Sequence, residues 1–156
     1  PYFLRGTGHD EYANYSEDSA TWERVLDRIK SKYETIKEYL PGSVIKKQGD
    51  GQKIGMIGYG STTPAMEEAF DRLNDHGFPV DYLRIRSTPF KDQTRKFIEE
   101  HDTVYVVEMN RDGQMHEILR LNYPDLACNL VSLTKHDGMP LSAVWVENAI
   151  LAEEKK

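Results

Sequence analysis

Apolar residues recur at steps of three and four positions between residues 19 and 40. The series consists of Trp22, Val25, Leu26, Ile29, Tyr33, Ile36 and Leu40. This spacing places the side chains on one stripe of an α-helix, with charged residues opposite. Asp18 or Ser19 is the expected cap at its start, and Pro41 with Gly42 is expected to end it. Such a helix is predicted to be a brace or connector at the edge of a domain.

Extended apolar runs alternate with helical patterns after this helix. Gly49, Asp50 and Gly51 separate the first two runs. Because glycine supplies the positive φ angles of a tight turn, residues 44–48 are predicted to pair antiparallel with residues 53–59. The later predicted strands span 80–86, 103–109 and 129–133, and the predicted helices span 64–75, 91–100, 113–122 and part of 140–156.

This alternation decides the fold class. Helical crossovers connect parallel strands in the right-handed sense, so the later strands are expected to run parallel. The chain is therefore predicted to be an α/β protein with a mostly parallel sheet of five strands and one antiparallel edge strand.

Composition restricts the function classes. The chain has 156 residues, enough for one domain with an arm, and a net charge of −6 without a compensating basic cluster, so nucleic acid is not an expected partner. Cys128 is the single cysteine and cannot form an internal disulfide. No apolar run reaches the roughly 20 residues that span a bilayer, and a cytoplasmic location without membrane contact is expected. The opening PYFLRGTGHD lacks an initiator Met, which suggests a piece of a longer protein.

Residues 1–17 show neither a helical nor a strand period and are predicted to form an irregular arm. The arm carries Tyr2, Phe3, Tyr12 and Tyr15. Aromatic side chains favour a packed environment over water. Two interpretations stay open: these side chains pack against a neighbouring protein, or they pack on this domain's own helices.

The histidines and the cysteine give little sign of a metal or catalytic site. The five histidines show no HxxxH or HxH spacing and Cys128 has no CxxC partner, so no metal site is expected. His9 lies beside Asp10 and Glu11, an arrangement that either orients an imidazole for proton transfer or is solvated surface, which is the preferred interpretation. No nucleophile motif stands out, and no catalytic residue is predicted.

The segment GYGSTTP follows a predicted strand and opens a predicted helix, with Thr63 as the cap and Pro64 in the first helical position. Free amides at such a turn can hold an anion, which makes Gly58, Gly60 and Ser61 candidate contacts. The alternative is that the glycines serve chain reversal and close helix packing. It is preferred for this chain in isolation, because the spacing matches neither GxGxxG nor a P-loop.

The segment TVYVVEMNRDGQM places Glu108, Asn110 and Gln114 at the carboxyl end of a predicted buried strand. Open α/β sheets bind ligands and partners at this edge, so recognition at an interface is the preferred interpretation. The alternative is that Asn110 and Asp112 cap the next helix while Glu108 accepts backbone amides or pairs with an arginine.

Several of these motifs together resemble one family. The segments GTGHDEY, DRIKSKYE, GMIGYGST, RIRSTPF and VVEMNRDGQM occur in an order similar to that of the carboxyl-terminal part of the α subunit of 2-oxoacid:ferredoxin oxidoreductases. The resemblance spans Arg5 to about Ile150 and is closer to the 2-oxoglutarate type than to the pyruvate type. It implies a domain like the carboxyl-terminal domain of transketolases, a three-layer α/β/α sandwich with a mixed five-strand sheet.

Enzymes of that family convert a 2-oxoacid and coenzyme A to an acyl-CoA and carbon dioxide, passing electrons through thiamine diphosphate and iron–sulfur clusters to ferredoxin. The resemblance implies that a thiamine-binding domain of the same subunit precedes this one, that the β subunit completes the thiamine site, and that the clusters sit elsewhere. One cysteine cannot ligate a cluster. Thiamine-bound magnesium is held by a Gly-Asp-Gly sequence followed by an asparagine. Gly49, Asp50 and Gly51 form the first part, but the expected downstream asparagine is missing.

We therefore expect a catalytically silent domain that buttresses the thiamine domain and forms subunit contacts. Its expected division is an arm (1–17), a connector helix (18–42) and an α/β domain (43–156), with the arm nearest the chemistry. The candidate contacts are His9, Asp10, Glu11, Tyr12, Gly58, Gly60, Ser61, Glu108, Asn110 and Gln114. The alternatives are the equivalent domain of a transketolase or E1-type enzyme, which EMNRDGQ disfavours, and a small regulatory module that binds an anionic metabolite at GYGST.

Overall fold

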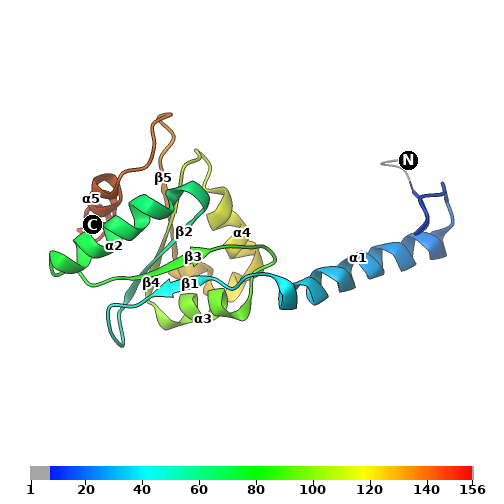
Figure 1. Cartoon of the computed structure of the whole chain (residues 1–156), viewed down its shortest axis with the longest axis horizontal. Coiled ribbons are helices and arrows are strands. Elements are labelled where there is room, and N and C mark those ends of the chain that lie inside the picture. The colour runs from blue at the N-terminus through cyan, green and yellow to red at the C-terminus, as the bar shows by residue number, and fades with distance from the viewer. Residues whose placement is uncertain (1–7, 156) are drawn as a thin grey trace. The chain divides into compact units, whose positions relative to one another are not determined.

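The computed structural model describes residues 8–155 (Figure 1). The chain divides into two compact units, the first ending at Leu40 and the second beginning at Pro41. The first contains a short turn and one long helix, and the second contains the whole sheet with its covering helices.

The long helix α1 (Ser19–Tyr39) lies where the apolar periodicity predicts it. The side chain of Asp18 accepts a hydrogen bond from the amide of Thr21, which satisfies one of the free donors at the start of the helix. The helix ends at Leu40, the residue before a proline. Val25 is its one buried residue, so most of the predicted apolar stripe is exposed within the described part of the chain.

Five strands form one sheet in the order β1-β3-β2-β4-β5. Their bounds are Val44–Lys46 for β1, Ile54–Tyr59 for β2, Asp81–Ile85 for β3, Thr103–Glu108 for β4 and Leu130–Thr134 for β5. β1 runs antiparallel to β3, and all other pairs are parallel. The prediction of a mostly parallel sheet with one antiparallel edge strand is confirmed.

The predicted hairpin between β1 and β2 is wrong. β1 pairs with β3, with Ile45 opposite Leu83, and β2 lies between β3 and β4. Residues 55–58 are all buried, so the inner strand gains most from two parallel neighbours, whereas the three-residue β1 suits an edge. Gly49 (φ 144°) and Gly51 (φ 76°) turn the chain between strands that are not neighbours.

Helices cover both faces of the sheet, which confirms the three-layer arrangement (Figure 1). One face packs against α2 (Thr63–Asp75) and α5 (Ala143–Glu153), and the other against α3 (Asp92–Glu100) and α4 (Gln114–Asn122). Neighbouring strand residues alternate between the two cores: Met56 and Tyr82 face α2 and α5, whereas Ile57 and Leu83 face α3 and α4. Short 3-10 helices span Gly60–Thr62 and Pro124–Asn129.

Candidate functional site

The carboxyl ends of β2, β3, β4 and β5 lie at one edge of the sheet because these strands are parallel. The sequence-predicted residues 58–61 and 108–114 both follow strands at this edge, so the fold brings the two predicted groups together. Open α/β sheets bind ligands and partners at this edge. It is therefore the candidate functional site.

Glu108 is fully buried at the end of β4 and is satisfied from within the chain. Its carboxylate accepts hydrogen bonds from the amides of Met115 (2.9 Å) and His116 (3.0 Å), in the first turn of α4. It also accepts from the Tyr59 hydroxyl (3.2 Å) and from the Asn110 side-chain amide (2.6 Å). Three of these donors reach Oε2 and one reaches Oε1, and the carboxylate has no exposure to solvent. Glu108 thus caps α4 and links it to β2.

The hydrogen bond between Tyr59 and Glu108 also shapes the electrostatics of this edge. Burial, followed by the negative charge of Glu108, raises the pKa of the Tyr59 phenol above its usual value. The phenol therefore stays protonated and donates to the carboxylate. It acts as a fixed link between the ends of β2 and β4.

Asn110 has a similar internal role in the loop before α4. Its side-chain oxygen accepts from the amides of Gly113 (2.7 Å) and Gln114 (3.2 Å). Gly113 adopts φ 68°, and a Cβ there would lie 2.6 Å from Ser132 Oγ, so glycine is required. The side chain of Gln114 is exposed, whereas Asp112 binds Arg111. Glu108 and Asn110 therefore build the loop, and Gln114 faces outward.

The GYGSTTP turn is likewise closed by its own hydroxyl groups. Thr62 Oγ1 donates to the carbonyl of Tyr59 (2.7 Å) and accepts from its amide (3.1 Å), and Thr63 Oγ1 donates to the carbonyl of Gly60 (2.8 Å). The expected cap at Thr63 is wrong: Thr63 is the first residue of α2 and Pro64 the second, because the 3-10 turn holds the chain in helical geometry one residue earlier.

The three candidate contacts of this turn differ in accessibility. Gly58 is buried, and a Cβ there would lie 2.9 Å from Met66 Cγ, so this glycine serves close packing of α2 on β2. Gly60 and Ser61 are exposed, and Gly60 adopts φ 58° with open space around it. Gly60 and Ser61 are the part of the turn that a partner or an anion can reach.

A pocket of about 750 Å³ opens beside this turn. Its wall combines the start of α2, the residue after β4 and the loop that follows β5, and includes Ser61, Pro64, Met109, His136, Met139 and Leu141. Lys135 is mostly buried there and binds Asp137 and the carbonyl of Met139 (3.1 Å). Sequence reasoning missed this loop, although Gly138 and Pro140 in HDGMP are turn signals.

The described part of the arm forms a closed turn that its acidic residues stabilise. His9 and Tyr15 form an antiparallel bridge, and the Asp10 carboxylate accepts from the amides of Tyr12 and Asn14, both at 2.9 Å. These bonds, led by that from Asn14, lower the pKa of Asp10 below its usual value. Glu11 binds Arg24 of α1 at 3.1 Å.

The aromatic residues of the arm divide into two groups. Tyr12 and Tyr15 are 80% and 54% exposed, so they do not pack into the described unit as core residues. Tyr2 and Phe3 lie outside the described residues, as do Arg5 and Gly6. Whether the arm contacts a neighbouring protein stays a prediction.

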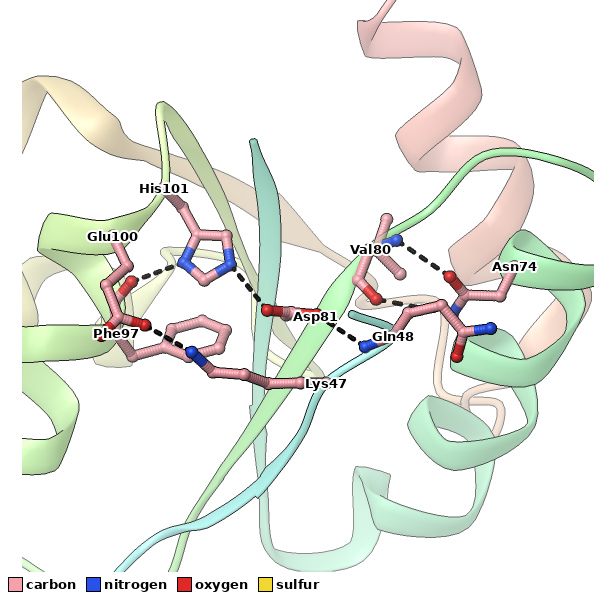
Figure 2. Close-up of polar contacts among 8 residues, drawn as sticks. All are labelled: Lys47, Gln48, Asn74, Val80, Asp81, Phe97, Glu100 and His101. Carbon is pink, nitrogen blue, oxygen red and sulfur yellow. Dashed lines mark hydrogen bonds and ion pairs between the residues drawn. The ribbon is translucent and has the colours of Figure 1, made fainter. Parts of the chain in front are cut away.

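A buried polar network at the opposite edge of the sheet was not predicted (Figure 2). Asp81, at the start of β3, accepts from the Gln48 amide through Oδ1 (2.9 Å) and lies 3.3 Å from His101 Nε2 through Oδ2. His101 Nδ1 lies 2.6 Å from the Phe97 carbonyl. Asp81 and His101 are both 2% exposed. This network ties the end of β1 to β3 and α3, a structural role distant from the candidate site.

The structure also bears on metal binding and on membrane crossing. Among residues 8–155, no group of three or more His, Cys, Asp or Glu side chains is placed to hold a metal ion. Across the same stretch, helices of the length and apolar character needed to cross a bilayer are absent. Cys128 is exposed.

Comparisons with known proteins identify the relatives of this chain. No family model matches it. The α subunit of 2-oxoacid:ferredoxin oxidoreductase 2 from Aeropyrum pernix is 28% identical over 154 residues, covering 94% of this chain and 23% of that protein. The 2-oxoacid:ferredoxin oxidoreductase α subunit from Saccharolobus solfataricus is 32% identical over 155 residues, covering 97% of this chain and 24% of that protein.

A solved structure has the same fold. The 2-oxoglutarate:ferredoxin oxidoreductase from Magnetococcus marinus, determined with 2-oxoglutarate, coenzyme A and succinyl-CoA bound, superposes with a TM-score of 0.82 at 20% identity. The match covers 98% of this chain and 27% of that one. The chain thus spans about a quarter of the length of the curated relatives it matches. Over nearly its whole length the chain is similar in sequence to α subunits of 2-oxoacid:ferredoxin oxidoreductases.

Proposed function

We propose that this chain is a non-catalytic interface domain of the α subunit of a 2-oxoacid:ferredoxin oxidoreductase. In this proposal residues 43–156 buttress the thiamine-binding domain of the same subunit, residues 18–42 form a connector, and the arm (1–17) lies nearest the reacting centre. The proposal is supported by homology over nearly the whole chain to a quarter of such subunits.

The whole enzyme would carry out thiamine-dependent oxidative decarboxylation of a 2-oxoacid, with 2-oxoglutarate as the proposed substrate, to an acyl-CoA with reduction of ferredoxin. The bound 2-oxoglutarate and succinyl-CoA of the Magnetococcus marinus protein support this substrate class. Thiamine diphosphate, magnesium and coenzyme A would be held by the complete heteromeric assembly in the cytoplasm. The iron–sulfur clusters would be held by other domains or subunits, because Cys128 alone cannot ligate one.

One observation carries the non-catalytic assignment: Glu108 is the buried carboxylate at the sheet edge where α/β enzymes place chemistry, yet four internal donors occupy it. A general base must come within hydrogen-bond reach of its substrate, whereas Glu108 is 0% exposed and binds internal donors through both oxygens. Glu108 instead fixes the loop that presents Gln114 and Met109 to the surface. A rigid loop of this kind suits an interface.

Such a domain would contribute by holding the reacting groups of its neighbours in place. Displacement of a reacting group by about 1 Å can cost on the order of a hundredfold in rate. The exposed residues at this edge, Gly60, Ser61 and Gln114, together with Tyr12 of the arm, are the proposed contacts to the neighbouring domain and subunit. His9, Asp10 and Glu11 would contribute by holding the arm in its turn.

Calorimetry on the 156-residue chain tests the assignment. Coenzyme A, 2-oxoglutarate and thiamine diphosphate are each titrated into the chain, and the chain is then titrated into the remaining part of the α subunit combined with the β subunit. We expect no heat from the three small molecules and tight association with the protein partners. Micromolar binding of any one small molecule by the chain alone contradicts the proposal.

The pocket favours one alternative function. Its wall includes Ser61 in the 3-10 turn before α2, and backbone N–H groups at the start of a helix attract anions, so a module that binds an anionic metabolite is a second candidate. The same calorimetry separates the two. Such a module would bind a small molecule and lose that binding in Ser61→Pro, whereas the interface domain would show no small-molecule binding to lose.

A further inference from the structure

Two buried side-chain atoms have no hydrogen-bond partner among residues 8–155, and both belong to β3. They are the hydroxyl oxygen of Tyr82 and Nε of Arg84. Each carries a hydrogen that it can donate. A buried donor without an acceptor costs free energy, and native proteins rarely leave one unpaired unless a water molecule or an ion accepts from it. Two such donors on one strand indicate a common acceptor.

The two donors lie on the same face of the sheet. Tyr82 is 1% exposed and packs in the core beneath α2 and α5, and side chains two residues apart on a strand point to the same face. Arg84 stands opposite Gly58 of β2, which has no side chain to cover it. Helix α2 packs against β3 on this face. A common acceptor would therefore sit between β3 and α2.

The Tyr82 phenol is placed to donate near the amino end of α2. Burial raises the pKa of this phenol to about 12, and the nearby Thr63 hydroxyl and the charge of Arg84 oppose that rise. The phenol therefore keeps its hydrogen at neutral pH. Thr63 is the first residue of α2 and donates its own hydrogen to the Gly60 carbonyl at 2.8 Å.

The charges around the two donors favour an anion over a neutral acceptor. Arg84 forms no ion pair within residues 8–155, whereas Glu67 of α2 pairs with Lys46 of β1 at 3.2 Å. Because Lys46 lies opposite Tyr82 in the sheet, this corner has an excess of positive charge. The amino end of α2 adds the positive end of the helix dipole. A water molecule could accept from both donors, but it would not balance the charge.

The ligand must be small, because neither donor atom is accessible to solvent. An organic anion would need a channel for the rest of the molecule, whereas a monatomic anion needs only the space between the donors. Arg84 is half-buried, so an ion can enter along its side chain.

We propose that Tyr82 and Arg84 bind a small inorganic anion of halide size, such as chloride, beneath the amino end of α2. The bound anion would link β3 to α2 and thereby stabilise the turn at Gly60 and Ser61 that precedes the helix. This inference does not depend on the enzyme that the domain serves.

Thermal unfolding of the 156-residue chain tests the proposal. The protein is freed of halide by dialysis against gluconate, and chloride or bromide is then added at constant ionic strength so that general screening stays the same. A ligand that binds only the folded state raises the melting temperature in a saturable way. We expect a rise of about 3 °C in about 0.2 M chloride or bromide, and none in acetate.

Two variants of the site have matched controls. Arg84→Met should abolish the response to halide, whereas Arg86→Met, at an exposed arginine two residues further on, should retain it. Tyr82→Phe should reduce the response by at least about half and, in gluconate, should melt no lower than the wild type, because it removes a donor that has no acceptor there. Tyr123→Phe, at a half-buried tyrosine, should leave the response unchanged.

Crystals of the wild type grown in bromide give a readout that does not depend on any variant. Anomalous scattering should show a bromide ion within hydrogen-bond distance of the Tyr82 hydroxyl and Arg84 Nε. A water molecule there instead would overturn the proposal. So would a bromide peak without any change in melting temperature, which would mark an adventitious ion only.

The unfolding experiments can also contradict the proposal. A halide response of wild-type size in Arg84→Met would show that the ion acts elsewhere. A response to acetate equal to that to chloride would exclude a site of halide size. A lower melting temperature of Tyr82→Phe than of the wild type in gluconate would show that the phenol already has a partner in the absence of halide.

Discussion

His101 lies between two hydrogen-bond acceptors, with Nδ1 2.6 Å from the carbonyl of Phe97 and Nε2 3.3 Å from the carboxylate of Asp81. A neutral imidazole has one N–H group and can donate to only one of them. The imidazole therefore joins α3 to the start of β3 inside the protein, where His101 and Asp81 are both buried.

This relationship gives a stability prediction for Asp81. We expect Asp81→Ala to lower the free energy of unfolding by roughly 3 kcal/mol, because it removes the partner of the buried His101 Nε2 and the acceptor for the Gln48 amide. Asp81→Asn keeps an acceptor for Gln48 and a polar group of the same shape beside His101 Nε2, so its cost should be about 1 kcal/mol. Denaturant unfolding measures both. Equal effects of the two variants would show that the pairing is not what stabilises this edge.

Glu147 predicts a pH dependence of stability. Glu147 is a buried residue of α5. Its carboxylate accepts a hydrogen bond from Arg72 Nε of α2 at 2.7 Å, and His76 Nδ1 lies 2.5 Å from it. The hydrogen bond from Arg72 lowers the pKa of Glu147 below its usual 4.5, against the opposing effect of burial. A lowered folded-state pKa stabilises the fold above the unfolded-state pKa. That stability is lost as the pH falls through the folded-state pKa.

Unfolding of the wild type and of Glu147→Gln between pH 7 and pH 3 checks this. The wild type should be the more stable above a pH of about 5 and should lose that advantage as the pH falls below about 4.5. Glu68→Gln is the matched control, since Glu68 reaches the same arginine at 3.8 Å but is exposed. It should show little pH effect. A difference between wild type and Glu147→Gln that stays constant with pH contradicts the assignment.

Gly113 and Gly60 form a matched pair of turn glycines. Both have positive φ, 68° and 58°, so alanine should cost about 1 kcal/mol at each from backbone strain. At Gly113 the new Cβ would also meet Ser132 Oγ at 2.6 Å, whereas Gly60 has open space. Gly113→Ala should therefore cost at least about 1 kcal/mol more than Gly60→Ala in thermal or denaturant unfolding. A smaller loss at Gly113 would mean that the loop relaxes around the added methyl.

The exposed tyrosines of the arm test the interface directly. Replacement of both Tyr12 and Tyr15 by alanine should change the free energy of unfolding by no more than about 0.5 kcal/mol, because neither is part of a core. The same double variant should weaken association with the remaining part of the α subunit and the β subunit. Calorimetric unfolding and binding measurements on the same preparation compare the two effects. A large loss of melting temperature would indicate internal packing instead.

The sequence predicted the fold better than the site, for physical reasons. Periodicity identified the strands and helices because burial repeats with the geometry of each element. The pairing of β1 depended on which strand lies inside the sheet, a property of the tertiary structure that turn glycines at Gly49 and Gly51 do not reveal. The true partner, β3, begins 32 positions after Gly49.

For the candidate site too, the local pattern could be predicted and the tertiary contacts could not. Its location at the ends of β2 and β4 could be predicted, since parallel strands end at one edge. The hydrogen bonds that Glu108 accepts could not be predicted, because one of its donors, Tyr59, lies 49 positions away in the sequence. Asp81 and His101, 20 positions apart, meet for a similar reason. Local motifs show which polar residues lie near strand ends, but the partners that satisfy them come from the packed fold.

We propose that this domain positions chemistry that other domains perform. Ferredoxin reduction with 2-oxoglutarate and coenzyme A tests it most directly. The assay is run on the 156-residue chain alone and on that chain combined with the remaining part of the α subunit and the β subunit. We expect no turnover by the chain alone, turnover by the assembly, and loss of that turnover when the chain is left out. Turnover by the isolated chain, or undiminished turnover by an assembly that lacks it, would contradict the account.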